Sequence, residues 1–463
     1  MIRRLADNPV APWAALGAYG CGLVLTAVGW QKSHDLLALN RWSLVWAVGV
    51  ALTAGVLFGL AMRWRRATPA GRRALQFAVL VAGLVPTVML AVAELALRLL
   101  AQPTALGPRV LGATLPPTWP EIRAANLAIL DRVAPGMDPW LTVVVPDPEL
   151  GWSIGPSRAT EDGLYRSSAE GIRSGEQGIV FGERRPALRI ALVGDSYTFG
   201  MEVPFESSWG AQLEQLLGPD AQVLNFGVDG YGIDQAFLRY RRDVRAWRPD
   251  VVLFGFIQHD MIRTAVVYPF LAFGWDYPFA KPRFLLGERG LRLVNTPLPD
   301  PRDLTAAASP EALPDIEFDR GYHGIDWRWR RGDSPLLARL FDAALPRWPV
   351  QPEVTSPPAM IELSAALLAA FLDDARLEGS EARILYFPSA GAGDFEVPAS
   401  AESRIASTML QRYAIPHLDL TACVAAVPSE RRVIAGGSHY TAEANAAVAR
   451  CLADELAPLL PKS

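Results

Sequence analysis

An apolar run at residues 188–193 stops at Gly194-Asp195-Ser196, and residues 205–217 then have the spacing of an amphipathic helix. Ser196 is therefore predicted at a turn between a strand and a helix. A hydroxyl in such a turn lies at the carboxyl edge of a sheet, close to backbone N–H groups that can stabilise an oxyanion. The same residues are also compatible with a plain turn in which Ser196 only caps a helix. Motifs later in the chain are needed to distinguish these two interpretations.

Strand and helix patterns alternate along the second half of the chain. Further strands are predicted at 221–225, 251–256, 383–387 and 417–420, and helices at 233–247, 361–377, 400–413 and 442–460. Alternation of this kind predicts an α/β fold with a parallel sheet and right-handed crossovers. The alternation is interrupted at about 263–358 by a segment rich in aromatic and charged residues, which we interpret as an insertion that caps the site or contacts a partner.

Three apolar segments of membrane-spanning length lie in the first 100 residues, at about 11–30, 42–62 and 74–97. The alternative is a signal peptide followed by buried core helices. The first segment is too long for the apolar part of a signal peptide, and it lacks a clear cleavage site. Residues 1–100 are therefore predicted to form a membrane anchor of three transmembrane helices.

The distribution of positive charge predicts how this anchor is oriented. Arginines cluster in the N-terminal tail and in the loop between the second and third segments, at Arg3, Arg4, Arg63, Arg65, Arg66, Arg72 and Arg73. The loop after the first segment contains only Lys32 and Arg41. Because positive loops stay in the cytoplasm, we expect a multi-pass protein of the cytoplasmic membrane with its N-terminus inside. Everything after residue 100 would then be extracytoplasmic or, in a cell with two membranes, periplasmic.

Composition excludes some partners and leaves one question open. The net charge is −4 and no basic stripe is present, so no nucleic-acid partner is expected. No metal-ligand spacing occurs, and neither a metal nor another cofactor is expected. Cys423 and Cys451 could pair in an oxidising compartment, but their spacing alone does not decide whether they do.

Residues 101–187 are predicted to be a connector and extension that packs on the domain formed by residues 188–463. Three later loops carry chemically useful side chains, namely Asn225 to Gly230, Gln258-His259-Asp260 and Ser438-His439. Each follows or faces the end of a predicted strand, so all are expected at one edge of the sheet. Together with Gly194-Asp195-Ser196, this order of motifs resembles the SGNH or GDSL-type hydrolases, which are esterases, lipases and carbohydrate acetyl hydrolases or transferases on a three-layer, flavodoxin-like fold.

The resemblance implies a role for each matched residue. Ser196 would be the nucleophile and His439 the general base. The backbone N–H groups of Ser196 and Gly230 would bind the oxyanion, with Gly227 as the less favoured glycine, and His259 would stand where the family has an asparagine that also binds the oxyanion. Asp195, Asn225, Gly227 and Asp260 are predicted to be structural residues near the site.

One departure from the family pattern bears directly on activity. The family's last motif contains an aspartate shortly before the histidine, whereas this chain has Gly436-Gly437-Ser438-His439. Loss of the acid from a Ser-His-Asp triad can cost about 10⁴-fold in rate, because the acid fixes the histidine tautomer. The Ser438 hydroxyl, a backbone carbonyl and Asp419 are the candidates to hold the imidazole in its place.

These features predict a membrane-tethered, extracytoplasmic esterase or O-acyltransferase that works through a Ser-His site. The expected substrates are acyl esters, above all acetyl esters, of surface or cell-wall glycans, with a lipid ester as the alternative. A transferase would also need an acyl-donating partner in the membrane. The competing hypothesis is a catalytically degenerate SGNH module that binds glycan or scaffolds an envelope assembly.

Overall fold

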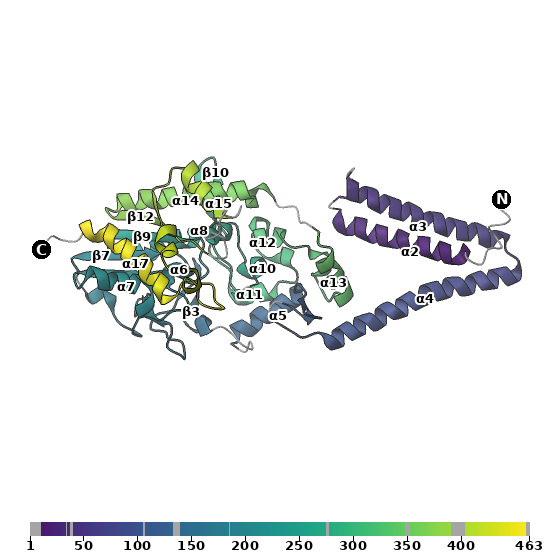
Figure 1. Cartoon of the computed structure of the whole chain (residues 1–463), viewed down its shortest axis with the longest axis horizontal. Helices are drawn as coiled ribbons and strands as arrows, with labels where there is room; N and C mark the ends of the chain where they lie inside the picture. The colour runs from purple at the N-terminus through teal and green to yellow at the C-terminus, as the bar shows by residue number, and fades with distance from the viewer. Residues whose placement is uncertain are drawn as a thin grey trace. The chain divides into compact units, whose positions relative to one another are not determined.

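The structure is a computed structural model (Figure 1). It describes residues 11–33, 35–37, 40–104, 107–132, 139–184, 186–274, 277–347, 352–389 and 403–459. The chain divides into two compact units. The first comprises Met1–Ala124 and His323–Val350, and the second comprises Ala125–Tyr322 and Gln351–Ser463.

A mostly parallel sheet forms the centre of the second unit. Its strands lie in the order β13-β12-β9-β7-β8-β6-β5. The five parallel strands are β7 (Leu188–Val193), β8 (Ala221–Asn225), β9 (Val251–Phe256), β12 (Glu381–Tyr386) and β13 (His417–Asp419). The short strands β5 (Arg166–Ser167) and β6 (Arg173–Ser174) extend one edge in the antiparallel sense. The predicted α/β fold with a flavodoxin-like parallel sheet is confirmed.

Strand β7 lies between the second and the third strand of the parallel set, so the strand order reverses direction at this strand. Ligands of open α/β sheets bind outside the carboxyl ends of the strands at such a reversal. The turn that carries Ser196 follows β7 directly. The topology therefore puts the predicted nucleophile at the expected binding edge.

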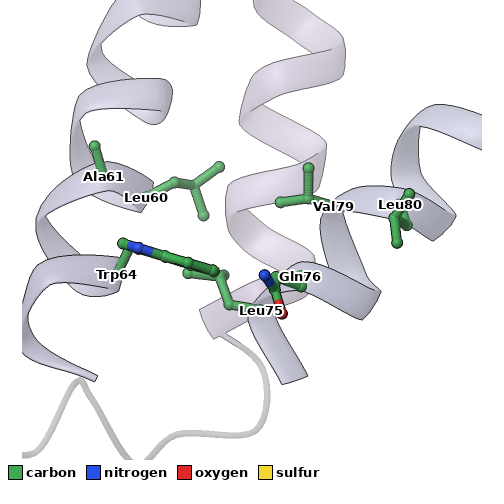
Figure 2. Close-up of a pocket in the computed structure, with 7 residues that line it drawn as sticks. All are labelled: Leu60, Ala61, Trp64, Leu75, Gln76, Val79 and Leu80. Carbon is green, nitrogen blue, oxygen red and sulfur yellow. The ribbon is translucent and has the colours of Figure 1, made fainter. Parts of the chain in front are cut away.

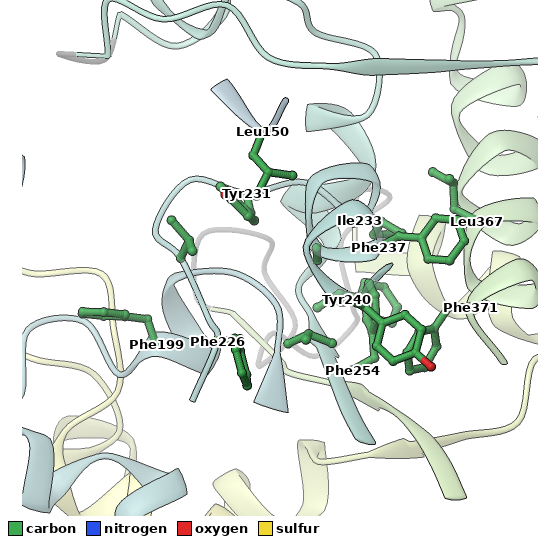
Figure 3. Packing of buried hydrophobic residues seen from close by; sticks show 14 of the residues in the cluster. Leu150, Phe199, Phe226, Tyr231, Ile233, Phe237, Tyr240, Phe254, Leu367 and Phe371 are labelled. Carbon is green, nitrogen blue, oxygen red and sulfur yellow. The ribbon is translucent and has the colours of Figure 1, made fainter. Parts of the chain in front are cut away.

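Helices cover both faces of this sheet and complete three layers. On one face, α8 (Ile233–Arg239) and α14 (Pro357–Leu377) pack on a core that includes Phe237, Phe254 and Phe371 (Figure 3). On the other face, α7 (Trp209–Leu217), α16 (Thr421–Ala425) and α17 (Ala442–Leu456) bury a second cluster. This continuous burial fits the nearly unbroken apolar sequences of β7 and β9.

The predicted helix boundaries need small corrections. The helix expected at 205–217 is a short 3₁₀ turn, η3 (Phe205–Ser207), followed by α7. Its start moves to Trp209 because the hydroxyl of Ser208 caps the helix at the Ala211 N–H. Helix α15 (Ser403–Arg412) matches the segment predicted at 400–413, of which residues 400–402 lie outside the described part of the chain.

The extension and the insertion each contribute a hairpin to the second unit. The extension forms β3 (Val144–Asp147) and β4 (Gly151–Ile154), and the insertion forms β10 (Arg283–Gly287) and β11 (Gly290–Val294). Helix α9 (Gln258–Arg263) follows β9 and leads into the insertion, whose short helices in this unit include α10 (Pro269–Ala272) and α11 (Pro301–Ala306). Helix α12 (Arg320–His323) ends at the first residue of the segment that belongs to the first unit. A buried ion pair of 2.5 Å between Lys281 and Asp234 joins the insertion to the start of α8.

The first unit contains three long N-terminal helices, α2 (Ala11–Lys32), α3 (Arg41–Arg66) and α4 (Pro69–Leu100). Among the described residues, two helices, α3 and α4, are long and apolar enough to cross a membrane. The sequence predicted three spans, and the span over α2 stays a prediction. An apolar pocket between α3 and α4 is lined by Leu60, Ala61, Trp64, Leu75, Gln76, Val79 and Leu80 (Figure 2).

Part of the insertion belongs to this first unit. Arg328 donates hydrogen bonds to the carbonyls of Trp30 (3.2 Å) and Gln31 (3.1 Å) at the end of α2. The carboxylate of Glu94, near the end of α4, accepts the N–H groups of Leu336 and Leu337, both at 3.0 Å, at the start of α13 (Leu336–Ala344). The C-terminal ends of α2 and α4 therefore contact one segment, residues 323–350.

Candidate active site

The turn that carries Ser196 is built around its two preceding residues. A Cβ on Gly194 would lie 2.4 Å from the carbonyl oxygen of Gly255, and Gly194 has a φ of 155°, so only glycine fits. Asp195 caps the short helix α6 (Ser196–Phe199) by accepting the N–H groups of Tyr197 (3.0 Å) and Thr198 (3.3 Å). Among the described residues the N–H of Ser196 has no acceptor. It therefore stays available for an oxyanion.

His439 lies beside this turn. The ring centroids of Tyr197 and His439 are 5.1 Å apart, and the Tyr197 hydroxyl donates to the carbonyl of Ser438 at 2.8 Å. The residue next to the predicted nucleophile thus anchors the loop that carries the predicted base, and Ser196 itself is 2% exposed. The two predicted residues lie at the same edge of the sheet.

The imidazole of His439 is held by a carboxylate that was not among the sequence candidates. Glu202 Oε1 lies 3.0 Å from His439 Nδ1. The Glu202 carboxylate also accepts the backbone N–H groups of Ser438 (3.3 Å) and His439 (3.4 Å). Glu202 thus occupies the place, relative to the histidine, that the acid of a Ser-His-Asp triad occupies.

Of the side chains that the sequence offered for this role, Ser438 contacts the imidazole and Asp419 forms a different hydrogen bond. Asp419 accepts the N–H of Thr421 at 2.9 Å and caps the turn after β13. The Ser438 hydroxyl lies 3.3 Å from His439 Nδ1, farther than Glu202, and it carries no charge that could balance an imidazolium. The carboxylate that contacts the imidazole is therefore a glutamate from the loop after Ser196, whereas the family pattern has an aspartate beside the histidine.

Several contacts fix the position of Glu202. Its φ of 65° lies in the left-handed region, which is uncommon for a residue other than glycine and is maintained only by its surroundings. The Tyr165 hydroxyl accepts the Glu202 N–H at 3.1 Å, and buried Arg173 donates to the carbonyl of Val203 at 3.0 Å. The hydrogen bond with His439 holds the pKa of the Glu202 carboxyl below its usual range, although partial burial opposes this. These contacts therefore favour the ionised form of the Glu202 carboxyl beside His439.

The loop after β8 supplies the predicted oxyanion glycines. The N–H of Gly227 donates to the Asn225 side chain at 2.9 Å, and Asn225 in turn donates to the Thr198 carbonyl at 2.8 Å. Asn225 and Gly227 thus fasten this loop to α6, and the Gly227 N–H is occupied. Gly230 has a φ of 78°, and its N–H has no acceptor within the described parts of the chain. This difference favours Gly230 over Gly227 as the oxyanion donor.

The third predicted loop forms the start of α9. His259 is half-buried, with its ring centroid 6.2 Å from that of Phe273. Asp260 accepts the N–H of Ile257 at 3.0 Å and a hydrogen bond from Arg263 at 2.5 Å. Asp260 therefore caps its own loop, and the oxyanion role of His259 stays a prediction.

Two buried carboxyls, Asp195 and Asp260, lie beneath these loops. Burial raises the pKa of each above its usual range, and the nearby guanidinium of Arg263 opposes that rise. In the part of the chain that the structure describes, no group of three His, Cys, Asp or Glu side chains could hold a metal ion.

The candidate site as a whole contains a hydroxyl, an imidazole in contact with a carboxylate, and backbone N–H donors without acceptors among the described residues. These are the groups that acyl transfer through a serine requires.

Part of the chain matches a known family. Residues 190–281 match the family model of the GDSL-like lipases and acylhydrolases. A search of curated protein sequences finds no match. The solved structures that resemble the chain include a lipase/acylhydrolase from Enterococcus faecalis, with 12% identity, 60% of this chain and 99% of that chain covered, and a TM-score of 0.32.

Two further structures of the same kind carry esterase names. An acetylxylan esterase from Geobacillus stearothermophilus has 12% identity, covers 58% of this chain and 94% of its own, and has a TM-score of 0.32. A carbohydrate acetylesterase from Sinorhizobium meliloti has 11% identity, covers 59% of this chain and 100% of its own, and has a TM-score of 0.29.

The fold is an α/β domain whose candidate site lies at the carboxyl edge of a parallel sheet. Residues 190–281 are thus similar to the SGNH/GDSL hydrolases, the GDSL-like lipases and acylhydrolases.

Proposed function

We propose that the protein is a membrane-tethered, extracytoplasmic serine esterase or O-acyltransferase whose site consists of Ser196, His439 and Glu202. The observation that carries this proposal is the 3.0 Å contact between Glu202 and His439 Nδ1. It replaces the acid that the sequence motif lacks, and it thereby favours an active enzyme over a degenerate binding module.

In the proposed reaction, the Ser196 oxygen attacks the carbonyl carbon of an ester while His439 takes the hydroxyl proton. The imidazolium that forms is stabilised by the ionised Glu202. The N–H groups of Ser196 and Gly230, with His259 as a third donor, stabilise the negative oxygen of the tetrahedral intermediate. His439 then gives its proton to the leaving alcohol, and an acyl-enzyme on Ser196 remains. Water or a sugar hydroxyl, deprotonated by His439, resolves it.

Two observations support the extracytoplasmic location. A disulfide joins Cys423 to Cys451, and such bonds persist in oxidising compartments. The C-terminal ends of α2 and α4 also contact the same segment, 323–350. This agrees with three spans in which those two ends lie outside and the arginine-rich turn between α3 and α4 lies inside.

The proposed substrates are acetyl or other short acyl esters of surface or cell-wall glycans. Ser196 is 2% exposed and is followed by Tyr197, whose ring packs on those of Phe387, His439 and Tyr440. Such close surroundings favour a small acyl group over a long one. A lipid ester is the competing substrate, and a transferase would need an acyl-donating partner in the membrane.

The proposal is tested on the full-length protein in detergent with a fluorophosphonate probe and with p-nitrophenyl acetate. Labelling and turnover should both be lost in Ser196→Ala and His439→Ala, and both should persist in the matched control Ser207→Ala. A folded protein that neither labels nor turns over would instead favour the glycan-binding module. Release of acetate from an O-acetylated polysaccharide then tests the substrate class.

A further inference from the structure

Arg263 of α9 contacts all three loops that carry the proposed oxyanion donors. Its Nη1 donates to the carbonyl of Tyr231 at 3.1 Å and to Asp260 Oδ1 at 2.5 Å. The same nitrogen lies 3.8 Å from Asp195 Oδ2. The Arg263 side chain is 9% exposed, so these contacts are made inside the protein.

Each partner of Arg263 is the chain neighbour of one proposed donor. Asp195 precedes Ser196, Tyr231 follows Gly230, and Asp260 follows His259. The three loops follow β7, β8 and β9, and one guanidinium group therefore links them just behind the donors.

Gly232 allows the loop after β8 to come close to α9. A Cβ on Gly232 would lie 2.9 Å from the Arg263 Cβ and 3.2 Å from the Asp260 carbonyl oxygen. Only a residue without a side chain lets the loop after β8 approach α9 this closely. Gly232 in the loop after β8 and the buried Arg263 of α9 therefore both contribute to this close contact.

Arg263 also compensates the charge of two buried carboxylates. Asp195 and Asp260 are fully buried, and a buried carboxylate is costly unless a cation or hydrogen-bond donors compensate it. A neutral side chain at position 263 would leave both carboxyls without the cation that lies closest to them, and the loops that they cap would lose their common partner.

We propose that Arg263 is a positioning residue that sets the oxyanion site, by holding the donors of Ser196, Gly230 and His259 in register with one another. The inference rests on the proposed function, because it concerns the same site. Removal of Arg263 should reduce stabilisation of the transition state while leaving substrate binding in the ground state nearly unchanged.

The test compares Arg263→Met and Arg263→Lys with the wild-type protein, all at full length in detergent. Fluorophosphonate titration counts the working sites, so that kcat for p-nitrophenyl acetate is expressed per site and misfolded protein does not contribute. Loss of a single oxyanion donor costs about 10²–10³ in kcat. For displaced donors we expect kcat per site to fall about 10- to 100-fold in Arg263→Met, less in Arg263→Lys, with KM within about twofold.

The matched control is Arg283→Lys. Arg283 is another buried arginine, and it donates to the carbonyls of Ala265 and Val354 in the insertion. Its variant should keep kcat per site even if it lowers the thermal stability. If Arg263→Met does not fold, Arg263→Lys decides the question.

The inference is overturned if kcat per site in the Arg263 variants stays within threefold of wild type, or if Arg283→Lys loses as much as Arg263→Lys. A wild-type protein that is folded but does not turn over is a different result. It contradicts the proposed function, and the inference falls with it.

Discussion

Gly437, in another loop, leaves the space that the Glu202 carboxylate occupies beside His439. A Cβ on Gly437 would lie 2.1 Å from Glu202 Oε2, far inside contact distance. Gly437→Ala is therefore expected to push the carboxylate away from the imidazole and to lower kcat for p-nitrophenyl acetate at least about tenfold, because the acid orients the base. Gly287→Ala is the control, since an added Cβ meets nothing within 4 Å there. Equal activity of the two variants would contradict the role given to Gly437.

The pairing of Glu202 with His439 also predicts a pH dependence of stability. The pKa of Glu202 is lowered from 4.5 in the folded protein, chiefly by its hydrogen bond with His439. A lowered folded-state pKa means that the carboxylate stabilises the fold above pH 4.5 and that this contribution is lost as the pH falls below it. Glu202→Gln should thus lower the melting temperature at pH 7 and change it much less at pH 3.5. A gap that is as large at pH 3.5 as at pH 7 would exclude the ionised Glu202 carboxylate as its cause.

At the scale of elements, the hairpin β3–β4 of the extension contacts the loop after β8, which carries the proposed oxyanion donor Gly230. Trp152 Nε1 donates to the carbonyl of Asp229, the residue before Gly230, at 2.9 Å, and the Tyr231 hydroxyl donates to the Trp152 carbonyl at 2.6 Å. The indole is fully buried. The extension therefore supports the proposed site directly.

Replacing Trp152 by phenylalanine keeps an aromatic ring and removes the N–H donor. We expect a fall in kcat of about three- to tenfold, in line with one neutral hydrogen bond of about 1 kcal/mol, and little change in KM. Steady-state kinetics of Trp152→Phe beside Trp247→Phe measures this, because Trp247 lies in the 3₁₀ turn Arg245–Trp247, which precedes β9, whereas the proposed site lies at the carboxyl ends of the strands. A change in KM alone would show that the hairpin serves substrate binding instead.

The elements of the sheet were predictable because each follows from local pattern. Strand β9 agrees with its predicted range of 251–256, and the turn at Ser196 follows from an apolar run that ends in Gly-Asp-Ser. Glu202 was not predictable in the same way, because its role depends on a contact between loops that are far apart in sequence. An acidic residue in the loop after the nucleophile, in a chain that lacks the usual aspartate, is the signal that could have indicated it.

At the scale of the whole molecule, the disulfide makes the predicted location measurable. The chain has three cysteines, of which Cys423 and Cys451 are joined and Cys21 is free. When cells are lysed directly into denaturant that contains a maleimide and no reductant, one cysteine should be labelled, and three should be labelled when the protein is reduced before the maleimide is added. Cys21→Ser should shift these counts to none and two. Three reactive thiols before reduction would contradict an oxidising compartment.

The membership of residues 323–350 in the first unit could not be predicted either. In sequence this segment is part of an aromatic, arginine-rich insertion, and nothing local indicates that Arg328 would bond to the end of α2 or that Glu94 would cap α13. Such contacts are fixed by tertiary structure. Only the apolar lengths of the three N-terminal segments, which are local, were visible in advance.

The central claim is that Glu202 completes a working Ser-His-acid site in a chain that lacks the usual aspartate. The most direct measurement is kcat for p-nitrophenyl acetate at pH 7 in the full-length Glu202→Gln protein, with Glu206→Gln, an exposed acid of the same loop, as the control. We expect a loss of about 10²-fold or more for Glu202→Gln, toward the roughly 10⁴-fold that removal of the acid costs a triad, and no loss for Glu206→Gln. A Glu202→Gln protein that is folded and turns over within threefold of the wild type would contradict it.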